Sequence, residues 1–299
     1  MLSTATRSDV AHAIGRATAF FAERETRAGV LARRLLGTAS TRDAVLADHL
    51  TRERRQRTRM DGSTDGSLVK SAWTALELLQ LDCPPDHAGV VRTMGWVLAR
   101  QSQPGRFGEE CSDERHAQGL CQHFLSGFFS PGPTDVGVAP LSFPSGVTVH
   151  GEEEARFAAS CFALRVVLRA RQERRQTVLD HVRSLLNLGQ VWSGWGGRWP
   201  PDLVLFALSG LAQAPLELQD RVEGLAAQVA RRQRADGSWA GADLIHAVDV
   251  MLTLPTAHAA VRAAVPQICR LSHDGEIFED PEAEERSLIA LRGLKAAAA

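Results

Sequence analysis

The stretch RRQRADGSWAGADLIHAVDVMLTL, residues 231–254, decides the fold. An arginine-rich helix is expected to end near Ala235, because the turn-forming residues 236–238 follow it directly. After Trp239 a second, apolar helix begins near Asp243, a residue type that caps helix N-termini well. The stretch therefore predicts two helices joined by a tight turn that contains glycine and an aromatic residue.

Similar turns recur along the chain. Their glycines lie about 40 residues apart, with one gap about twice as long, and they are Gly62, Gly105, Gly194, Gly237 and Gly275. A period of this length is typical of repeated helical pairs, in which a single pair cannot bury its apolar face alone. The sequence therefore predicts a helical-repeat architecture interrupted by one long insertion.

Apolar residues recur at helical spacing almost throughout, for example in residues 69–81 and 155–169. Only residues 145–150, SGVTVH, alternate in the way that is typical of a strand. We therefore predict an all-α protein.

The helices that precede the turns are basic and polar, whereas those that follow them are apolar. This asymmetry predicts two concentric layers, with an outer ring against solvent and an inner ring buried on both sides. About five or six such pairs would close into an α/α toroid, and an open solenoid of the HEAT or armadillo type is the alternative. The turns that combine glycine with an aromatic residue favour the toroid. We expect one domain over residues 1–299, with a lid-like insertion at residues 106–150.

The turn resembles the Gln-x-x-Asp-Gly-Ser-Trp repeat of the terpenoid cyclase and protein prenyltransferase superfamily, over about residues 50–295 outside the insertion. The matching residues are Gln233, Asp236, Gly237, Ser238 and Trp239. The resemblance implies that the glutamine caps a helix end and that the tryptophan packs over it. It also implies an enzyme that cyclises or transfers an isoprenoid, or a similarly apolar substrate, in a central aromatic-lined cavity.

Two motifs of that superfamily are absent. The chain has no Asp-x-Asp-Asp run, which is the acid motif of squalene–hopene and related class II cyclases. The repeat before residue 231 has no cysteine that could form the Asp-x-Cys of the prenyltransferase zinc site. The resemblance therefore predicts the fold more specifically than the reaction.

Asp249 and His246 are the candidate catalytic residues. They are three positions apart, so they share one face of the apolar helix and could form an acid–base pair or supply a metal ligand. The alternative is that both lie at a layer boundary with ordinary partners. Further acidic candidates form a run before the last helix, at Glu279, Asp280, Glu282, Glu284 and Glu285.

Aromatic residues are the candidate substrate-binding groups, because their π-faces can stabilise a developing carbocation. These candidates are Trp192, Trp195, Trp199, Trp239, Phe128 and Phe129. Packing between repeats is the alternative role for the tryptophans, and for Trp239 it is the favoured one.

The insertion concentrates the side chains that bind zinc, namely Cys111, Asp113, His116, Cys121 and His123. Their spacing matches no common zinc motif, so three interpretations stay open. The segment is a metal site, a lid whose phenylalanines cover the cavity, or an apolar patch at residues 124–133 that contacts a membrane or a partner. The cofactor is left open, with zinc or magnesium as candidates.

The formal net charge of −1 gives no support for a nucleic-acid partner. Charges interrupt residues 1–30, and no apolar run is long enough to span a bilayer, so we expect a cytoplasmic protein. Five scattered cysteines argue against a disulfide framework. Besides an isoprenoid enzyme, a zinc-dependent toroid enzyme and a non-catalytic peptide-binding repeat protein remain alternatives. The sequence does not indicate an oligomeric state.

Overall fold

The computed structural model describes residues 4–101, 129–131, 137–197 and 199–298. The chain divides into two compact units, and each is described by itself. The first unit contains residues 1–52, 144–147 and 223–299, and the second contains residues 53–143 and 148–222. The predicted single domain over residues 1–299 stays a prediction.

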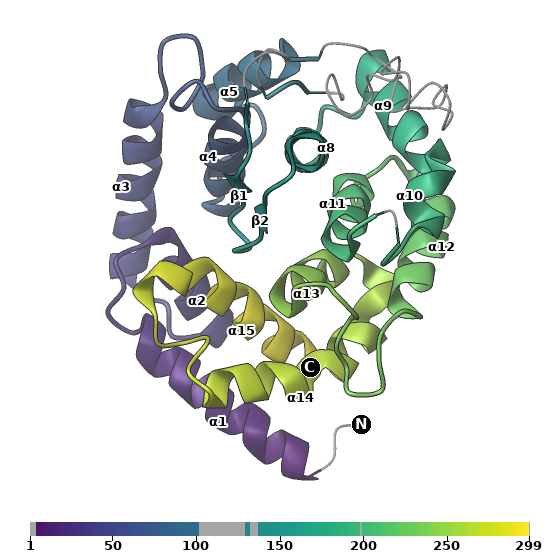
Figure 1. The fold of residues 1–299 in the computed structure, drawn as a ribbon. Coiled ribbons are helices and arrows are strands. Elements are labelled where there is room, and N and C mark those ends of the chain that lie inside the picture. Colours follow the sequence, from purple (N-terminus) through teal and green to yellow (C-terminus); the bar gives the residue numbers. More distant parts are fainter. Residues whose placement is uncertain (1–3, 102–128, 132–136, 198, 299) are drawn as a thin grey trace. The chain divides into compact units, whose positions relative to one another are not determined.

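The first unit is built from helices that are distant in sequence (Figure 1). Helix α15 packs against α13, α14, α2 and α1, and α14 packs against α1 and α13. The unit's helices are α1 (Thr4–Phe21), α2 (Arg27–Leu36), α13 (Leu244–Leu252), α14 (His258–His273) and α15 (Glu284–Ala298). The unit boundaries fall inside α3 (Thr41–Arg57) and α12 (Gln219–Ala230).

The second unit is centred on α8 (Glu152–Arg169), which packs against α4 (Leu68–Gln80) and α11 (Pro201–Leu211). Helix α5 (Ala88–Leu98) packs on α4, and α9 (Gln176–Asn187) packs on α11, as Figure 1 shows. The short helix α10 (Gly189–Ser193) precedes α11. Strands β1 (Leu141–Ser142) and β2 (Thr148–Val149) form an antiparallel pair in which Leu141 is opposite Val149, so the strand predicted in residues 145–150 is confirmed.

The predicted alternation of buried and wetter helices is confirmed helix by helix. Seven consecutive residues of α13, from 245 to 251, are buried, and in α11 only Asp202 is not fully buried. Helix α12, which precedes the turn at residues 236–238, instead exposes about half of its residues to solvent. Helices α11 and α13 are covered on all sides, which fits their mostly apolar composition. The described residues are helical apart from turns and the one short hairpin, so the all-α prediction is confirmed.

The turn at residues 236–239 shows why its sequence is specific. Asp236 Oδ1 accepts hydrogen bonds from the Ser238 N–H (2.9 Å) and hydroxyl (2.7 Å), which closes the turn. Gln233 Nε2 donates to the Gly237 carbonyl (2.8 Å) and to the Ala260 carbonyl of α14 (2.9 Å). The Trp239 indole is only 2% exposed and donates to the Val229 carbonyl of α12 (3.0 Å). These contacts give Gln233 and Trp239 structural roles in joining α12 and α14.

Candidate functional site

Asp249 is a buried carboxyl group on an apolar helix. Helix α13 begins after Asp243, whose Oδ1 accepts a hydrogen bond from the His246 backbone N–H (2.9 Å) and so caps the helix. His246 is 2% exposed and Asp249 5% exposed, so the two predicted catalytic residues both lie inside the first unit. A carboxylate this deeply buried needs partners, because transfer of an unpaired charge out of water is very costly.

The partners of Asp249 come from α15. Arg292 Nη1 lies 3.3 Å from Asp249 Oδ1, with the guanidinium about one third exposed. Glu285 lies seven positions before Arg292, about two helical turns, and therefore projects from the same face of α15. Glu285 forms an ion pair with Arg27, the first residue of α2, whose side chain is 5% exposed. We call Arg27, Asp249, Glu285 and Arg292 the carboxyl–arginine cluster.

One carboxyl group of the cluster has a raised pKa. Burial raises the pKa of Glu285 above its ordinary value, and the negative charge of Asp249 raises it further. Arg27 and Arg292 act in the opposite direction, but the net shift in the pKa of Glu285 is upward. Two adjacent carboxyl groups do not both ionise easily, so such a pair tends to keep a proton. This is the property that a general acid requires.

A second contact holds the N-terminus of α13 in place. Arg286 Nη1 donates to Asp243 Oδ2 (2.9 Å) and to the Ser145 carbonyl (3.0 Å). The two oxygens of Asp243 therefore serve different tasks, since Oδ1 caps α13 and Oδ2 binds α15. The arrangement holds α13 and α15 in register next to the cluster.

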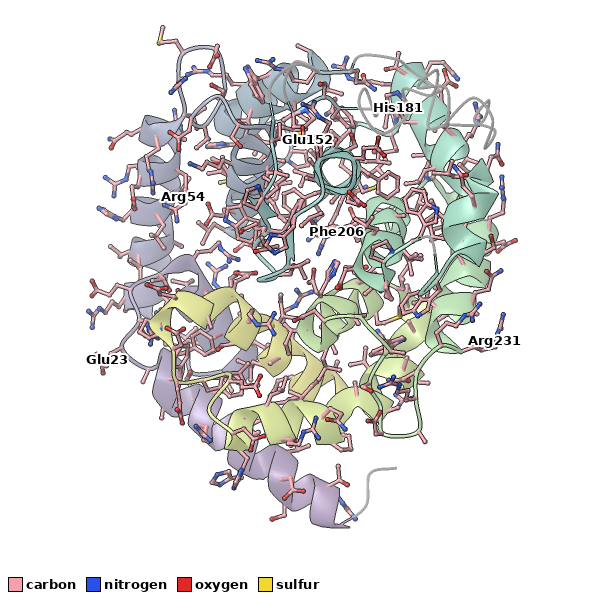
Figure 2. The ribbon with its side chains drawn as sticks, viewed as in Figure 1. Glu23, Arg54, Glu152, His181, Phe206 and Arg231 are labelled. Carbon is pink, nitrogen blue, oxygen red and sulfur yellow. The ribbon has the colours of Figure 1, made fainter. Side chains whose placement is uncertain are left out.

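The second unit contains an ion pair with one buried partner, Arg156, that was not among the predicted site residues. Arg156 of α8 is 1% exposed, and its Nε donates to Glu152 Oε1 at 2.7 Å. Glu152, at the start of α8 (Figure 2), also accepts hydrogen bonds from the Val138 and Ala139 N–H groups at 2.8 and 2.9 Å. Burial alone would raise the pKa of Glu152, but these N–H groups and Arg156 lower it. Glu152 is therefore a stable carboxylate, and the signal for the pair was an arginine four residues after it in an apolar helix.

No family model and no curated protein matches the chain. Two solved structures match it over 99% of both chains, with TM-scores of 0.57 and 0.56 at 12% and 14% sequence identity. Both are variants of the type II terpene cyclase MstE from Scytonema in complex with its substrate, geranylgeranyl dihydroxybenzoate. The chain has the terpenoid cyclase fold. The fold class predicted from the sequence, an all-α, α/α toroid, is therefore confirmed.

Of the aromatic residues predicted to bind substrate, Phe129, Trp199 and Trp239 are buried in the described structure. Trp199 is 3% exposed and its ring meets Phe157 edge-on, with centroids 5.0 Å apart. The Trp192 indole donates to the Leu185 carbonyl (3.1 Å), and Trp195 is partly exposed. Phe129 is fully buried against His181, while Phe128 lies outside the described residues. A substrate-binding role for these aromatic side chains stays a prediction.

The predicted metal ligands Cys111, Asp113, His116, Cys121 and His123 all lie outside the described residues. Within the described part of the chain, no group of three or more His, Cys, Asp or Glu side chains is arranged to hold a metal ion. The metal and lid interpretations of the insertion therefore stay predictions. Nor does any described helix combine the length and the hydrophobicity needed to cross a membrane.

A cavity of about 470 Å³ in the second unit lies where α4, α8 and α11 end. Its lining includes Leu79, Leu168, Glu173 and Leu216, and none of the predicted site residues. The carboxyl–arginine cluster, rather than this cavity, contains the groups suited to acid chemistry.

Proposed function

We propose that the protein is a terpenoid cyclase-like enzyme that protonates an isoprenoid, or a similarly apolar substrate, and thereby starts its cyclisation. Two kinds of observation support the proposal. The fold is that of type II terpene cyclases, of which MstE binds a geranylgeranyl substrate. The observation that carries the proposal is the buried carboxyl pair of Asp249 and Glu285 between two arginines.

Asp249 is the proposed proton donor. In the first step the O–H bond of its carboxylic acid breaks and a C–H bond forms at an alkene carbon of the substrate, which becomes a carbocation. The carboxylate that remains lies 3.3 Å from Arg292, whose positive charge stabilises it at the moment it forms. The carbocation closes its ring and later loses a proton, so no other reactant is consumed.

Glu285 is proposed to share one proton with Asp249, so that the pair holds the proton that Asp249 donates. Its raised pKa favours a proton on the pair at a pH where an isolated carboxyl group would be ionised. His246, one helical turn before Asp249 on α13, is the proposed group that orients the acid.

The test is an Asp249→Asn substitution assayed with geranylgeranyl dihydroxybenzoate and with simpler geranylgeranyl compounds, with cyclised products identified by mass spectrometry. The amide keeps the shape of the side chain but has no acidic proton, so we expect turnover to fall by at least about 100-fold. The matched control is Asp274→Asn, which changes an exposed aspartate of the same unit. Unchanged turnover in Asp249→Asn would exclude Asp249 as the acid. Tight binding of the probe to the unaltered protein without any product would support the non-catalytic alternative.

A further inference from the structure

Among the described residues of the second unit, three large apolar side chains are strongly exposed to solvent, namely Leu216, Met60 and Val91. Met60 is 94% exposed and Val91 is 54% exposed. Their segments abut, because a Cβ atom placed on Gly62 would come within 2.4 Å of the Arg92 carbonyl oxygen. Met60 and Val91 therefore belong to one surface, although 30 residues of chain separate them.

The turn that presents Met60 is held in place by its own hydrogen bonds. The Arg59 N–H donates to the Ser63 carbonyl (2.8 Å), and the Gly62 N–H donates to the Arg59 carbonyl (3.0 Å). Asp61 Oδ1 accepts from the Ser63 N–H (2.9 Å) and hydroxyl (2.8 Å), which lowers the pKa of Asp61. Gly62 has a φ of 95°, which a residue with a side chain rarely adopts. The exposure of Met60 is thus a consequence of a defined turn.

Several arginines lie within a few residues of Met60 or Val91 along the chain. The exposed ones are Arg55, Arg57, Arg59 and Arg92. Arg54 is directed elsewhere, because its Nε binds Glu77 of α4 at 2.7 Å (Figure 2). We call Arg55, Arg57, Arg59, Met60, Val91 and Arg92 the Met60 patch.

The acidic groups near the patch have local partners. Glu53 lies 3.6 Å from Arg57 and 3.4 Å from Arg54, and Asp65 lies 2.8 Å from Lys70. Asp61, which is near Arg59, stays negatively charged, because the hydrogen bonds from Ser63 lower its pKa. The four arginines of the patch outnumber Asp61 and Glu53, so the Met60 patch combines a positive charge excess with exposed apolar side chains.

We propose that the Met60 patch is a docking surface for an anionic lipid bilayer. Guanidinium groups bind lipid phosphates through paired N–H donors, and the surface potential of anionic lipids attracts them before contact. Met60 and Val91 then leave water by entering the region between the headgroups. Charge alone would fit an acidic protein equally well, but the two exposed apolar side chains beside the arginines in sequence favour the lipid surface. This inference does not depend on the proposed cyclisation.

The experiment is co-sedimentation of the full chain with vesicles of phosphatidylcholine alone, or with one quarter phosphatidylglycerol. We expect binding to the anionic vesicles only. This binding should be lost at 0.5 M salt, because salt screens the electrostatic attraction of about 1 kcal/mol between each basic residue and the anionic surface. Removal of one arginine, in Arg59→Gln, is expected to weaken the partition coefficient by about fivefold. Met60→Ser is expected to weaken it by a similar factor, about fivefold, because the apolar tip is lost.

The matched control is Val45→Ser, which removes another exposed apolar side chain, 67% exposed, from the first unit. It is expected to leave vesicle binding unchanged. Equal binding to neutral and anionic vesicles, or no binding to either, would overturn the proposal. A third outcome would also overturn it. In that outcome Met60→Ser binds vesicles as well as the unaltered protein does, and polyglutamate displaces the protein from the vesicles. That result would assign the patch to an acidic macromolecule.

Discussion

Arg27, the first residue of α2, forms an ion pair with Glu285, the second residue of α15. The two residues are 258 positions apart, and both side chains are largely buried, at 5% and 18% exposure. The pair therefore ties the N-terminal part of the first unit to its last helix. Its energetic role differs from that of the exposed ion pairs elsewhere in the chain.

We predict that Arg27→Met lowers the free energy of unfolding by about 3 kcal/mol, because the buried Glu285 carboxyl group loses the guanidinium that binds it. The measurement is urea denaturation followed by circular dichroism. Arg42→Met is the matched control, because the Arg42 and Glu25 side chains are 70% and 62% exposed. An exposed pair is worth at most about 1 kcal/mol. Equal losses in the two variants would contradict a special role for the buried pair.

The raised pKa of Glu285 predicts a defined pH dependence of stability. Its ordinary value is 4.5, so above about pH 4.5 the unfolded chain releases this proton while the folded chain retains it. The contribution of Glu285 to stability is therefore greatest below that pH, and it declines as the pH rises through the folded pKa. The free energy of unfolding, compared between the unaltered protein and Glu285→Gln from pH 4 to 8, should show this decline. A difference that grows in favour of the unaltered protein with rising pH would show that the pKa is lowered instead.

A further prediction concerns the turn that joins α12 to α13. Gly237 has a φ of 87°, and a Cβ atom there would lie 2.0 Å from the Ala263 carbonyl oxygen of α14. We expect Gly237→Ala to lower the free energy of unfolding by about 3 kcal/mol, because the strain of a positive φ and the clash with the Ala263 backbone both destabilise the folded chain. Gly224→Ala, within α12 and with nothing near the new Cβ, should instead stabilise by about 0.5–1 kcal/mol. Thermal unfolding of both variants is the measurement. A loss of stability in Gly237→Ala alone would assign the effect to the close approach of Gly237 to the Ala263 backbone, whereas a loss in both variants would contradict this explanation.

The local elements of the fold could be predicted from the sequence. The helical periods, the turn of Asp236 to Trp239 and the N-cap at Asp243 depend on residues within a few positions of one another. The predicted burial of α13 followed from its mostly apolar composition, and the structure confirms it. Such features can be predicted from a single sequence because the interacting groups are neighbours along the chain.

The composition of the candidate site was only partly predictable. Asp249 and His246 were identified because a carboxylate and an imidazole interrupt an apolar helix, and Glu285 was included only as one member of an acidic run. Nothing in the sequence indicated that Glu285, rather than Glu279 or Glu282, would join Asp249. Helical period limits which residues share a face of α15, but it does not specify which helix packs on that face.

By itself, therefore, the sequence determined the helical repeat, the turn chemistry and the residues that are costly to bury. Tertiary structure alone decided the partners of those residues: Arg292 for Asp249, Arg27 for Glu285, and the backbone of residues 138–139 for Glu152. The physical reason is that ionisation depends on desolvation and on charges brought near by folding, and the four residues of the carboxyl–arginine cluster come from three helices. Chain neighbours determine a turn or a cap, whereas the proton of a buried carboxyl pair depends on how α2, α13 and α15 pack.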